Sequence, residues 1–334
     1  MKRIPLLLAL LLLAAAGGAS ASPAPRGDLP RLGLLVARGH DTLVYGLDGR
    51  PHARLVGVRA PWFANTDTAR NAAFQQLAQV LPDRTLLAGP HGQWYVFDPA
   101  GRLVPFASPR LRLAGDLEVV AQARPSKDGV FPVDVTVERA GRVIVPASAQ
   151  LRRISGNLAV GWSSAIDLRT GARWRVSRDC YAVRSEGDEL LMFCGPNGAK
   201  GAVRLVAVST TGARRTLARL PNSLYATSAF ISPNGKDVVG MFSPGCGPSY
   251  GFVVPTRGGT ARPLSGERRW ALTGPNSIAL GWTADDRIVA IVQPSSRLET
   301  EPKAGVYLID PDTLRRRLVY PKADAWAMWS PATG

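Results

Sequence analysis

Residues 305–321 read GVYLIDPDTLRRRLVYP. An apolar run is followed by the turn Asp310-Pro311-Asp312 and then by a second run of strand-forming residues. Because Pro and Asp between apolar runs are typical of a tight turn, the stretch predicts a β-hairpin. Variants of it occur seven times along the chain, beginning at Thr42, Trp94, Val133, Ala165, Val203, Gly251 and Gly305.

The repeats lie roughly 30 to 55 residues apart, and each is too small to bury its own apolar face. Such units are stable only when neighbours stack, and strand-forming composition favours a β-propeller over a helical solenoid. A second element, consisting of a strand, a tight polar turn and another apolar strand, precedes every repeat except the first. The sequence therefore predicts an all-β fold built from blades of four antiparallel strands, named a to d from the centre outward.

The strand that is missing before the first repeat is present at the other end of the chain. It is the segment AWAMWSP at residues 325–331. Because an unpaired edge strand invites association with other chains, a ring of blades is expected to close without an open edge. We therefore predict one seven-bladed β-propeller over residues 31–332, in which the C-terminal strand a joins the N-terminal strands b, c and d.

Two motifs carry a resemblance to a known family of repeats. The turn SPNGK at residues 232–236 precedes an apolar strand, and residues 329–331 read WSP. The stretch at residue 305 contains an apolar strand that ends in Ile309-Asp310. This pattern is similar to the TolB-like, WD-like β-propeller repeat and covers nearly the whole chain after residue 30. The resemblance implies a fold, and it implies no particular activity.

One region departs from the strand rhythm. Residues 61–71 interrupt it, and Thr66 or Asp67 is a candidate cap for a short helix. Phe74, Leu77 and Leu81 would then lie on one face of that helix. Residues 75–81 are also where the repeat requires strand a of the second blade. The sequence leaves helix and strand open at this position.

The N-terminus has the features of a secretory signal peptide. A basic start, Met1-Lys2-Arg3, precedes an apolar run at residues 4–16 and the small-residue site Ala19-Ser20-Ala21. The apolar run is too short for a membrane anchor. We predict a signal peptide at 1–21, cleaved after Ala21, and a flexible lead at 22–30. The protein is then secreted or periplasmic, monomeric, and at most peripherally associated with a membrane.

The chain is strongly basic, with 41 Lys and Arg against 25 Asp and Glu and a formal net charge of +16. Such a charge bears on partners and not on fold. An envelope protein or an anionic polymer is the expected partner. Nucleic acid is not expected, because the sequence contains no helix-turn-helix, zinc-finger or RNA-binding signature.

Three cysteines, Cys180, Cys194 and Cys246, suit an oxidising compartment with one disulfide and one remaining thiol. Cys180 begins strand a of the fifth blade and Cys194 ends strand b, so a tight turn places them nearly opposite each other. We favour this pair, and Cys194 with Cys246 is the alternative. The spacings match no zinc pattern, so no metal or cofactor is predicted.

An arginine follows the turn between strands c and d in every repeat. We name these arginines the basic rim, and two interpretations remain open. Charge on the outer strand blocks edge-to-edge pairing. Alternatively, the rim docks an anionic polymer or membrane through planar guanidinium groups. The basic rim consists of Arg50, Arg102, Arg142, Arg173, Arg214, Arg262 and Arg315.

Acidic and amide side chains recur in the turns between strands a and b, for example Asp116, Asn157, Asp188, Asn234 and Asp285. The simple interpretation is that they hydrogen-bond their own backbone and tolerate left-handed geometry. The alternative is a ring of oxygen ligands around one mouth of the channel that holds a cation.

Loops between strands b and c share the other face of the ring, and they are rich in Gly, Ser and Pro. Such loops support binding more readily than catalysis. We therefore predict a non-enzymatic binding or scaffolding propeller of the cell envelope, and no catalytic residue is assigned. A propeller lyase or hydrolase acting on a glycan or peptide, and a polyanion binder, are the alternatives. The candidate recognition face contains His40, His91, Pro196, Asn197, Ser243, Tyr250 and Ser295.

Overall fold

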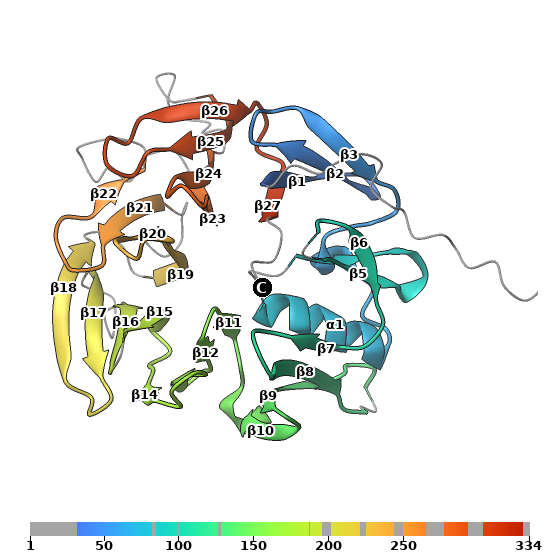
Figure 1. The fold of residues 1–334 in the computed structure, drawn as a ribbon, viewed down its shortest axis with the longest axis horizontal. Helices are drawn as coiled ribbons and strands as arrows, with labels where there is room; N and C mark the ends of the chain where they lie inside the picture. The colour runs from blue at the N-terminus through green and yellow to red at the C-terminus, as the bar shows by residue number, and fades with distance from the viewer. Residues whose placement is uncertain are drawn as a thin grey trace, which may run out of the picture.

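The structure is a computed structural model of the 334-residue chain. It describes residues 32–81, 85–98, 100–125, 128–186, 188–195, 202–220, 225–243, 250–264, 277–292 and 303–329. Seven antiparallel sheets surround a central channel, and each sheet is one blade (Figure 1). The predicted seven-bladed β-propeller is therefore confirmed.

The strands of each blade follow one another from the channel outward, in chain order except where the ring closes. Blade 1 contains β27 (Ala325–Trp329), β1 (Gly33–Arg38), β2 (Asp41–Gly46) and β3 (Pro51–Leu55). Blade 2 contains β4 (Leu86–Ala88), β5 (Trp94–Phe97) and β6 (Leu103–Phe106). Blade 3 contains β7 (Arg110–Arg112), β8 (Leu117–Ala123), β9 (Val133–Arg139) and β10 (Arg142–Val145). Blade 4 contains β11 (Arg153–Ser155), β12 (Leu158–Val160), β13 (Ser164–Asp167) and β14 (Arg173–Arg175).

The remaining blades have the same order. Blade 5 contains β15 (Cys180–Glu186), β16 (Glu189–Cys194), β17 (Val203–Ser209) and β18 (Arg214–Leu220). Blade 6 contains β19 (Tyr225–Ile231), β20 (Asp237–Ser243), β21 (Tyr250–Pro255) and β22 (Arg262–Pro263). Blade 7 contains β23 (Ser277–Trp282), β24 (Ile288–Val292), β25 (Gly305–Ile309) and β26 (Arg316–Tyr320). Short 3-10 helices are η1 (Pro61–Phe63), η2 (Pro90–Gly92) and η3 (Ala147–Ala149).

The ring closes as the sequence predicted, because β27 from the C-terminal end pairs with β1 from the N-terminal end. Leu34 lies opposite Met328 and Leu35 lies opposite Ala327 in this antiparallel ladder. On the outer side, the rings of Tyr45 in β2 and Tyr320 in β26 are 4.7 Å apart and join blade 1 to blade 7. Both ends of the chain are thereby held in one sheet, so the inner edge of β1 is paired.

Blade 2 differs from the others in having a helix where strand a would lie. The open choice at residues 75–81 is resolved as helix α1 (Ala69–Val80). The helix begins at Thr68, whose hydroxyl accepts a hydrogen bond from the N–H of Asn71 at 3.2 Å. Its face with Phe74 and Leu77 is completely buried against the core of blades 2 to 4, where Phe74 stacks on Trp94. A helix satisfies its own backbone hydrogen bonds, so it can line the channel without a strand partner.

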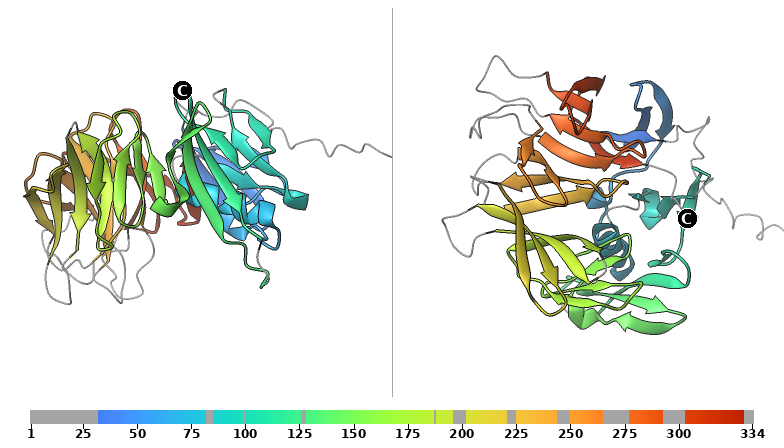
Figure 2. Two further views of the ribbon diagram at one scale, coloured as in Figure 1. Left: turned by 90° about the horizontal axis from the view of Figure 1, so that it is seen from below. Right: turned by 60° about the vertical axis from the view of Figure 1, so that its left-hand side comes forward.

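The core lies between the blades. Among the described residues, buried apolar side chains form clusters that each join neighbouring blades, as the stacked sheets in Figure 2 illustrate. Leu34 and Val36 of blade 1 pack against Val289 and Val306 of blade 7, for example. Because each blade buries its faces only against its neighbours, the closed ring is the unit of stability.

The favoured disulfide is present between Cys180 and Cys194. The two residues lie directly opposite each other in the ladder of β15 and β16, with their Cα atoms 4.0 Å apart. The alternative pair of Cys194 with Cys246 is therefore wrong for this structure, and Cys246 itself lies outside the described residues. In the described part of the chain, no helix has the length and apolar character needed to cross a bilayer.

Candidate functional site

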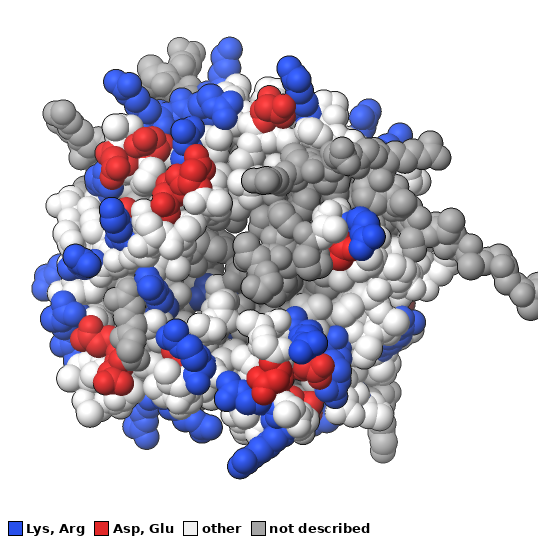
Figure 3. All heavy atoms as spheres, in the orientation of Figure 1, with Lys and Arg blue, Asp and Glu red and all other residues white. Residues whose placement is uncertain are grey.

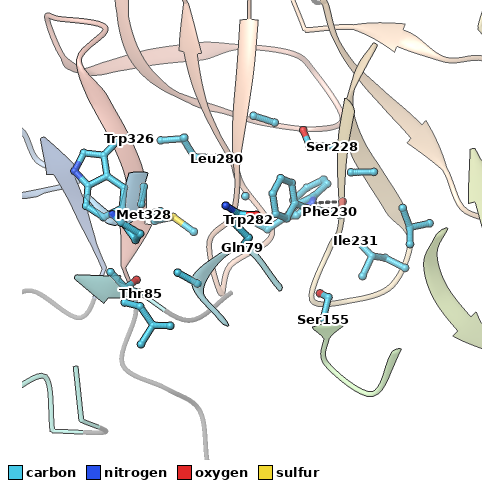
Figure 4. Close-up of a pocket in the computed structure, with 18 of the residues that line it drawn as sticks. Gln79, Thr85, Ser155, Ser228, Phe230, Ile231, Leu280, Trp282, Trp326 and Met328 are labelled. Atoms are coloured by element: carbon cyan, nitrogen blue, oxygen red, sulfur yellow. Dashed lines mark hydrogen bonds between the residues drawn. The ribbon is translucent and has the colours of Figure 1, made fainter. Parts of the chain in front are cut away.

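The inner strands and helix α1 enclose a pocket of about 820 Å³ in the central channel, which we name the channel pocket (Figure 4). Six blades and the helix contribute to it, because the innermost elements of the blades face the channel. A volume of this size suits a drug-sized ligand or a few side chains of a partner. Its described lining is Pro61, Trp62, Gln75, Ala78, Gln79, Thr85, Leu86, Ser155, Val183, Arg184, 228–233, 279–282, Trp326, Ala327 and Met328.

Aromatic side chains form much of the pocket wall. Trp326 of β27 meets Trp62 of η1 edge-to-face, with ring centroids 4.9 Å apart. On β23, Trp282 donates from its indole nitrogen to the backbone carbonyl of Phe230 at 2.8 Å, which fixes the indole ring (Figure 4). Large rings held at fixed positions offer contact area at a small entropic cost.

The aromatic wall extends out of the pocket. Trp62 is 53% exposed and the neighbouring Phe63 is 56% exposed, and their rings lie 5.9 Å apart. Both belong to η1, which connects β3 to helix α1 and begins with Pro61. Large aromatic residues seldom stay exposed together on a monomer without a function in binding.

A few polar groups interrupt the apolar lining. The hydroxyl of Ser228 and the indole nitrogen of Trp326 are buried, and neither makes a hydrogen bond within the described structure. Gln79 on α1 is exposed in the pocket, whereas Gln75 donates to the carbonyl of Pro61 at 3.3 Å. Buried polar groups without partners cost free energy, so the Ser228 hydroxyl and the Trp326 indole nitrogen lower the stability of the pocket wall.

Arg184 is the only charged side chain among the described residues that line the pocket. Its guanidinium lies against Gly235 in the turn between β19 and β20, at the place where any larger residue would carry its Cβ atom. Gly235 also has a φ of 71°, which favours glycine. Because Gly235 has no side chain, Arg184 of blade 5 can pack against the β19–β20 turn of blade 6 at the edge of the pocket.

A second arginine, Arg153 of β11, is buried beside the channel. It donates to the hydroxyl of Tyr181 and to the carbonyls of Ala182 and Ala229, and its guanidinium lies 4.2 Å from the Tyr181 ring centroid. These acceptors belong to blades 5 and 6, so one side chain of blade 4 ties three blades together. No described carboxylate forms an ion pair with it, and neutral acceptors solvate the charge instead.

The predicted recognition face is only partly described. His40 lies in the exposed β1–β2 turn and His91 in exposed η2, so they belong to loops of two different blades. Neither lines the channel pocket. Ser243 ends β20 opposite Tyr225, and half-buried Tyr250 begins β21. Pro196, Asn197 and Ser295 lie outside the described residues.

The arginines of the basic rim lie at or just before the outermost strand of each blade. Six of its arginines are exposed and Arg262 is half-buried. Arg50 forms an ion pair with Asp48, and Arg102 forms one with Asp98. The charge of these two rim arginines is therefore partly neutralised. Lys and Arg side chains surround the molecule in Figure 3, with Asp and Glu side chains among them.

In two of the turns between strands a and b, the acidic or amide side chain bonds within its own turn, as the first of the two interpretations predicts. The side-chain oxygen of Asn234 accepts the N–H of Lys236 at 2.8 Å. Asp285 accepts the hydroxyl of Thr283 at 2.5 Å and pairs with Arg287 at 3.2 Å. Within the described part of the chain, no group of three or more potential ligands is suited to a metal ion. Asn234 and Asp285 therefore stabilise their own turns, whereas Asp116 pairs with Arg139 of β9.

The pocket residues Trp62, Phe230, Trp282 and Trp326 were not singled out from the sequence. A signal for three of them was present, because they belong to strands a, whose alternate side chains face the channel. Trp62 carried no such signal, since it lies in an irregular connection.

No protein-family model matches the chain, and no curated protein matches it. Among solved structures, it is similar to TolB from Acinetobacter baumannii, with a TM-score of 0.42 and 10% identity over 91% of this chain and 67% of that chain. It is also similar to a putative TolB from Agrobacterium tumefaciens, with a TM-score of 0.37 and 12% identity over 89% and 88% of the two chains.

A third similar structure is puromycin hydrolase, with a TM-score of 0.38 and 16% identity over 62% of this chain and 38% of that chain. The chain thus spans well under half of the hydrolase. At these identities the likeness concerns the fold alone, and the chain resembles TolB-like β-propellers in structure. Both binding proteins and enzymes occur on this scaffold, so the comparisons assign no function.

Proposed function

We propose that the protein is an exported, non-enzymatic binding propeller of the cell envelope, and that its channel pocket receives an apolar segment of a partner protein. One observation carries this proposal. The pocket of about 820 Å³ is walled by Trp62, Phe230, Trp282 and Trp326 and opens onto exposed aromatic rings. Fixed aromatic residues around a recess are typical of the centre of a protein-binding surface.

The composition of the lining supports binding over catalysis. The described lining contains no His, Cys, Asp or Glu, and Arg184 is its only ionisable side chain. Hydrolysis or elimination requires a positioned acid, base or nucleophile next to the bound substrate. His40 and His91, the sequence-based candidates for such a role, line neither this pocket nor one common site.

The exposed aromatic rings support a macromolecular partner over a small enclosed ligand. Trp62 lines the pocket and is also half exposed, and Phe63 beside it continues the apolar surface outward. A ligand confined to the pocket would leave Phe63 in water. A protein that inserts an apolar segment and covers η1 would bury the exposed half of both rings, and each would contribute roughly 1 kcal/mol.

Export is supported by two independent features. The first 21 residues have the pattern of a cleaved signal peptide. The disulfide between Cys180 and Cys194 suits an oxidising compartment such as the periplasm or the exterior. We place the protein there and expect it to act as a monomer.

The test compares Trp62→Ala with Trp162→Ala. Trp162 is 45% exposed and belongs to blade 4, outside the described lining of the channel pocket, so it is a matched control. The tagged wild-type protein captures partners from envelope extract at low and high salt, and the partner is identified, purified and titrated. Salt-resistant binding that is lost in Trp62→Ala and kept in Trp162→Ala is the expected result.

Other results would overturn the proposal. Equal affinity of the wild-type protein and Trp62→Ala would place the partner elsewhere on the surface. Capture of a glycan or peptide that the wild-type protein then cleaves would identify the chain as an enzyme. Capture that disappears at high salt would indicate binding through the basic surface, since exposed charges are screened by salt.

A further inference from the structure

A second recess lies outside the channel, where the outer strands of blades 3 and 4 meet. It has a volume of about 440 Å³ and lies between β10 and the turn that joins β13 to β14. We name it the arginine groove, because its lining contains Arg139, Arg142, Arg169 and Arg173. Two of these, Arg142 and Arg173, are members of the basic rim that the propeller brings together from adjacent blades.

Arg139 is held in place at the floor of the groove. It donates to the carbonyl of Leu168 in blade 4 at 2.6 Å, which fixes its guanidinium across the junction of the two blades. Its Nε is buried and makes no hydrogen bond in the described structure. The nearest described carboxylate, that of exposed Asp116, is 3.5 Å from this nitrogen. The Arg139 guanidinium is thus a fixed positive charge at the junction of the two blades, and its ion pair with Asp116 offsets part of that charge.

Arg142 and Arg173 supply the remaining charge. Both side chains are exposed, and neither forms an ion pair with a described residue. Other rim arginines such as Arg50 and Arg102 have a carboxylate partner within their own turn. The two groove arginines therefore keep their donors available to a ligand, in contrast to these members of the rim.

The one acid in the groove lining does not cancel this charge. Asp167 is 1% exposed, and its two carboxylate oxygens accept hydrogen bonds from the N–H groups of Arg169 and Thr170 and from the hydroxyl of Ser185. Arg169 also lies 3.9 Å from it. The carboxylate is thus engaged by donors of blades 4 and 5, and the exposed Arg142 and Arg173 leave a positive field over the groove.

We propose that the arginine groove is a binding site for phosphate groups, either free or carried by an anionic envelope polymer. Several guanidinium groups around one recess suit the negatively charged, tetrahedrally arranged oxygens of phosphate. Each planar guanidinium can donate two parallel hydrogen bonds to them. This site is separate from the channel pocket, so it does not depend on the function proposed for that pocket.

The test uses charge-matched double variants. Arg142→Gln with Arg173→Gln removes two charges from the groove. Arg214→Gln with Arg315→Gln removes two charges at the equivalent positions of blades 5 and 7, and these arginines are exposed and form no ion pair with a described residue. Titration calorimetry measures inorganic phosphate, long-chain inorganic polyphosphate and polyglutamate against each variant, and a thermal melt confirms that each variant folds.

We expect the groove variant to weaken binding of phosphate and polyphosphate by more than about tenfold, because two charge-assisted hydrogen-bonding groups are lost. The control variant should change binding by less than about twofold, since its charges lie far from the site. If phosphate and polyphosphate bind with similar affinity per site, the groove recognises the phosphate group itself. If only polyphosphate binds, the ligand is a polymer.

Three results would overturn the proposal. One is the absence of binding by the wild-type protein to both phosphate probes. Another is an equal loss of affinity in the two double variants, which would mean that net charge alone governs binding. The third is binding of polyglutamate with the same affinity and the same dependence on Arg142 and Arg173, which would identify a carboxylate-bearing partner instead.

Discussion

Leu34 lies directly opposite Met328 in the ladder that joins β1 to β27, although the two residues come from opposite ends of the described chain. Leu34 is completely buried and packs against blade 7. Met328 reaches the channel pocket and lies 3.3 Å from the position that a Cβ atom on Gly281 would take. Closure of the ring and formation of the pocket therefore depend on the same strand.

A chain that ends at residue 324 should lose stability sharply. Without β27, Leu34 and Leu35 would be exposed and the inner edge of β1 would be unpaired. Exposure of two buried leucines costs on the order of 4 kcal/mol. Chemical denaturation and sedimentation should show a lower midpoint and association of chains. A chain that ends at residue 329 is the control, and unchanged stability of the shorter chain would refute the closure.

Reduction of the Cys180–Cys194 disulfide should destabilise the fold by about 3 kcal/mol, the value expected for a loop closed over 14 residues. Cys180→Ser should have the same effect and should remove the sensitivity to reductant. Thiol titration of the unfolded, unreduced wild-type protein should find one free thiol. Loss of that thiol in Cys246→Ser would support the pairing, whereas a peptide linking Cys194 to Cys246 would contradict it.

Arg153→Ala should cost on the order of 3 kcal/mol in the free energy of unfolding. The substitution leaves the hydroxyl of Tyr181 and the carbonyls of Ala182 and Ala229 without their buried donor. Arg152→Ala is the control, because Arg152 is the exposed neighbour. Its loss removes only a surface contact with the Trp162 ring, 4.6 Å away. Similar denaturation midpoints for the two variants would show that Arg153 does not join the blades.

Asp167→Asn should destabilise the protein at neutral pH and less so in acid. Burial alone would raise the pKa of Asp167, but hydrogen bonds from Ser185, Thr170 and Arg169 outweigh it and hold the pKa below its usual value of 3.8. A carboxyl with a lowered folded pKa stabilises the fold above its unfolded pKa, and that contribution is lost as the pH falls through the folded pKa. Thermal melts of both proteins from pH 7 to pH 3 should converge, and a constant difference would contradict the prediction.

Asp237→Asn should have the opposite effect. Burial raises the pKa of Asp237 above 3.8, and the nearby Arg262 offsets this only in part. A carboxyl with a raised folded pKa opposes folding once it is ionised, so its penalty appears as the pH rises through the unfolded pKa. The variant should melt at the same or a higher temperature than the wild-type protein at pH 7. The gain should vanish below about pH 4, near the unfolded pKa of the carboxyl. A melting temperature of Asp237→Asn below that of the wild-type protein at pH 7 would contradict the prediction that ionised Asp237 opposes folding.

Local patterns explain why so much of the fold was predictable. The hairpin at residues 305–321 becomes β25 and β26, and the lone strand at residue 325 becomes β27. The pairing of Cys180 with Cys194 followed from their places in one hairpin. The helix at residues 69–80 was only one of two options, because the repeat also required a strand at residues 75–81. Burial of Phe74 and Leu77 against blade 3 decides for the helix.

The seven repeats, the last strand that closes the ring and the arginine in each repeat could be read from the amino-acid sequence, because each follows from a recurring local pattern. Which side chains of different blades meet could not be read from the sequence. Trp62, Phe230, Trp282 and Trp326 surround one pocket, and Arg139, Arg142 and Arg173 share one groove. These residues belong to different blades, so their proximity depends on how the blades stack around the channel, which no local pattern of residues records.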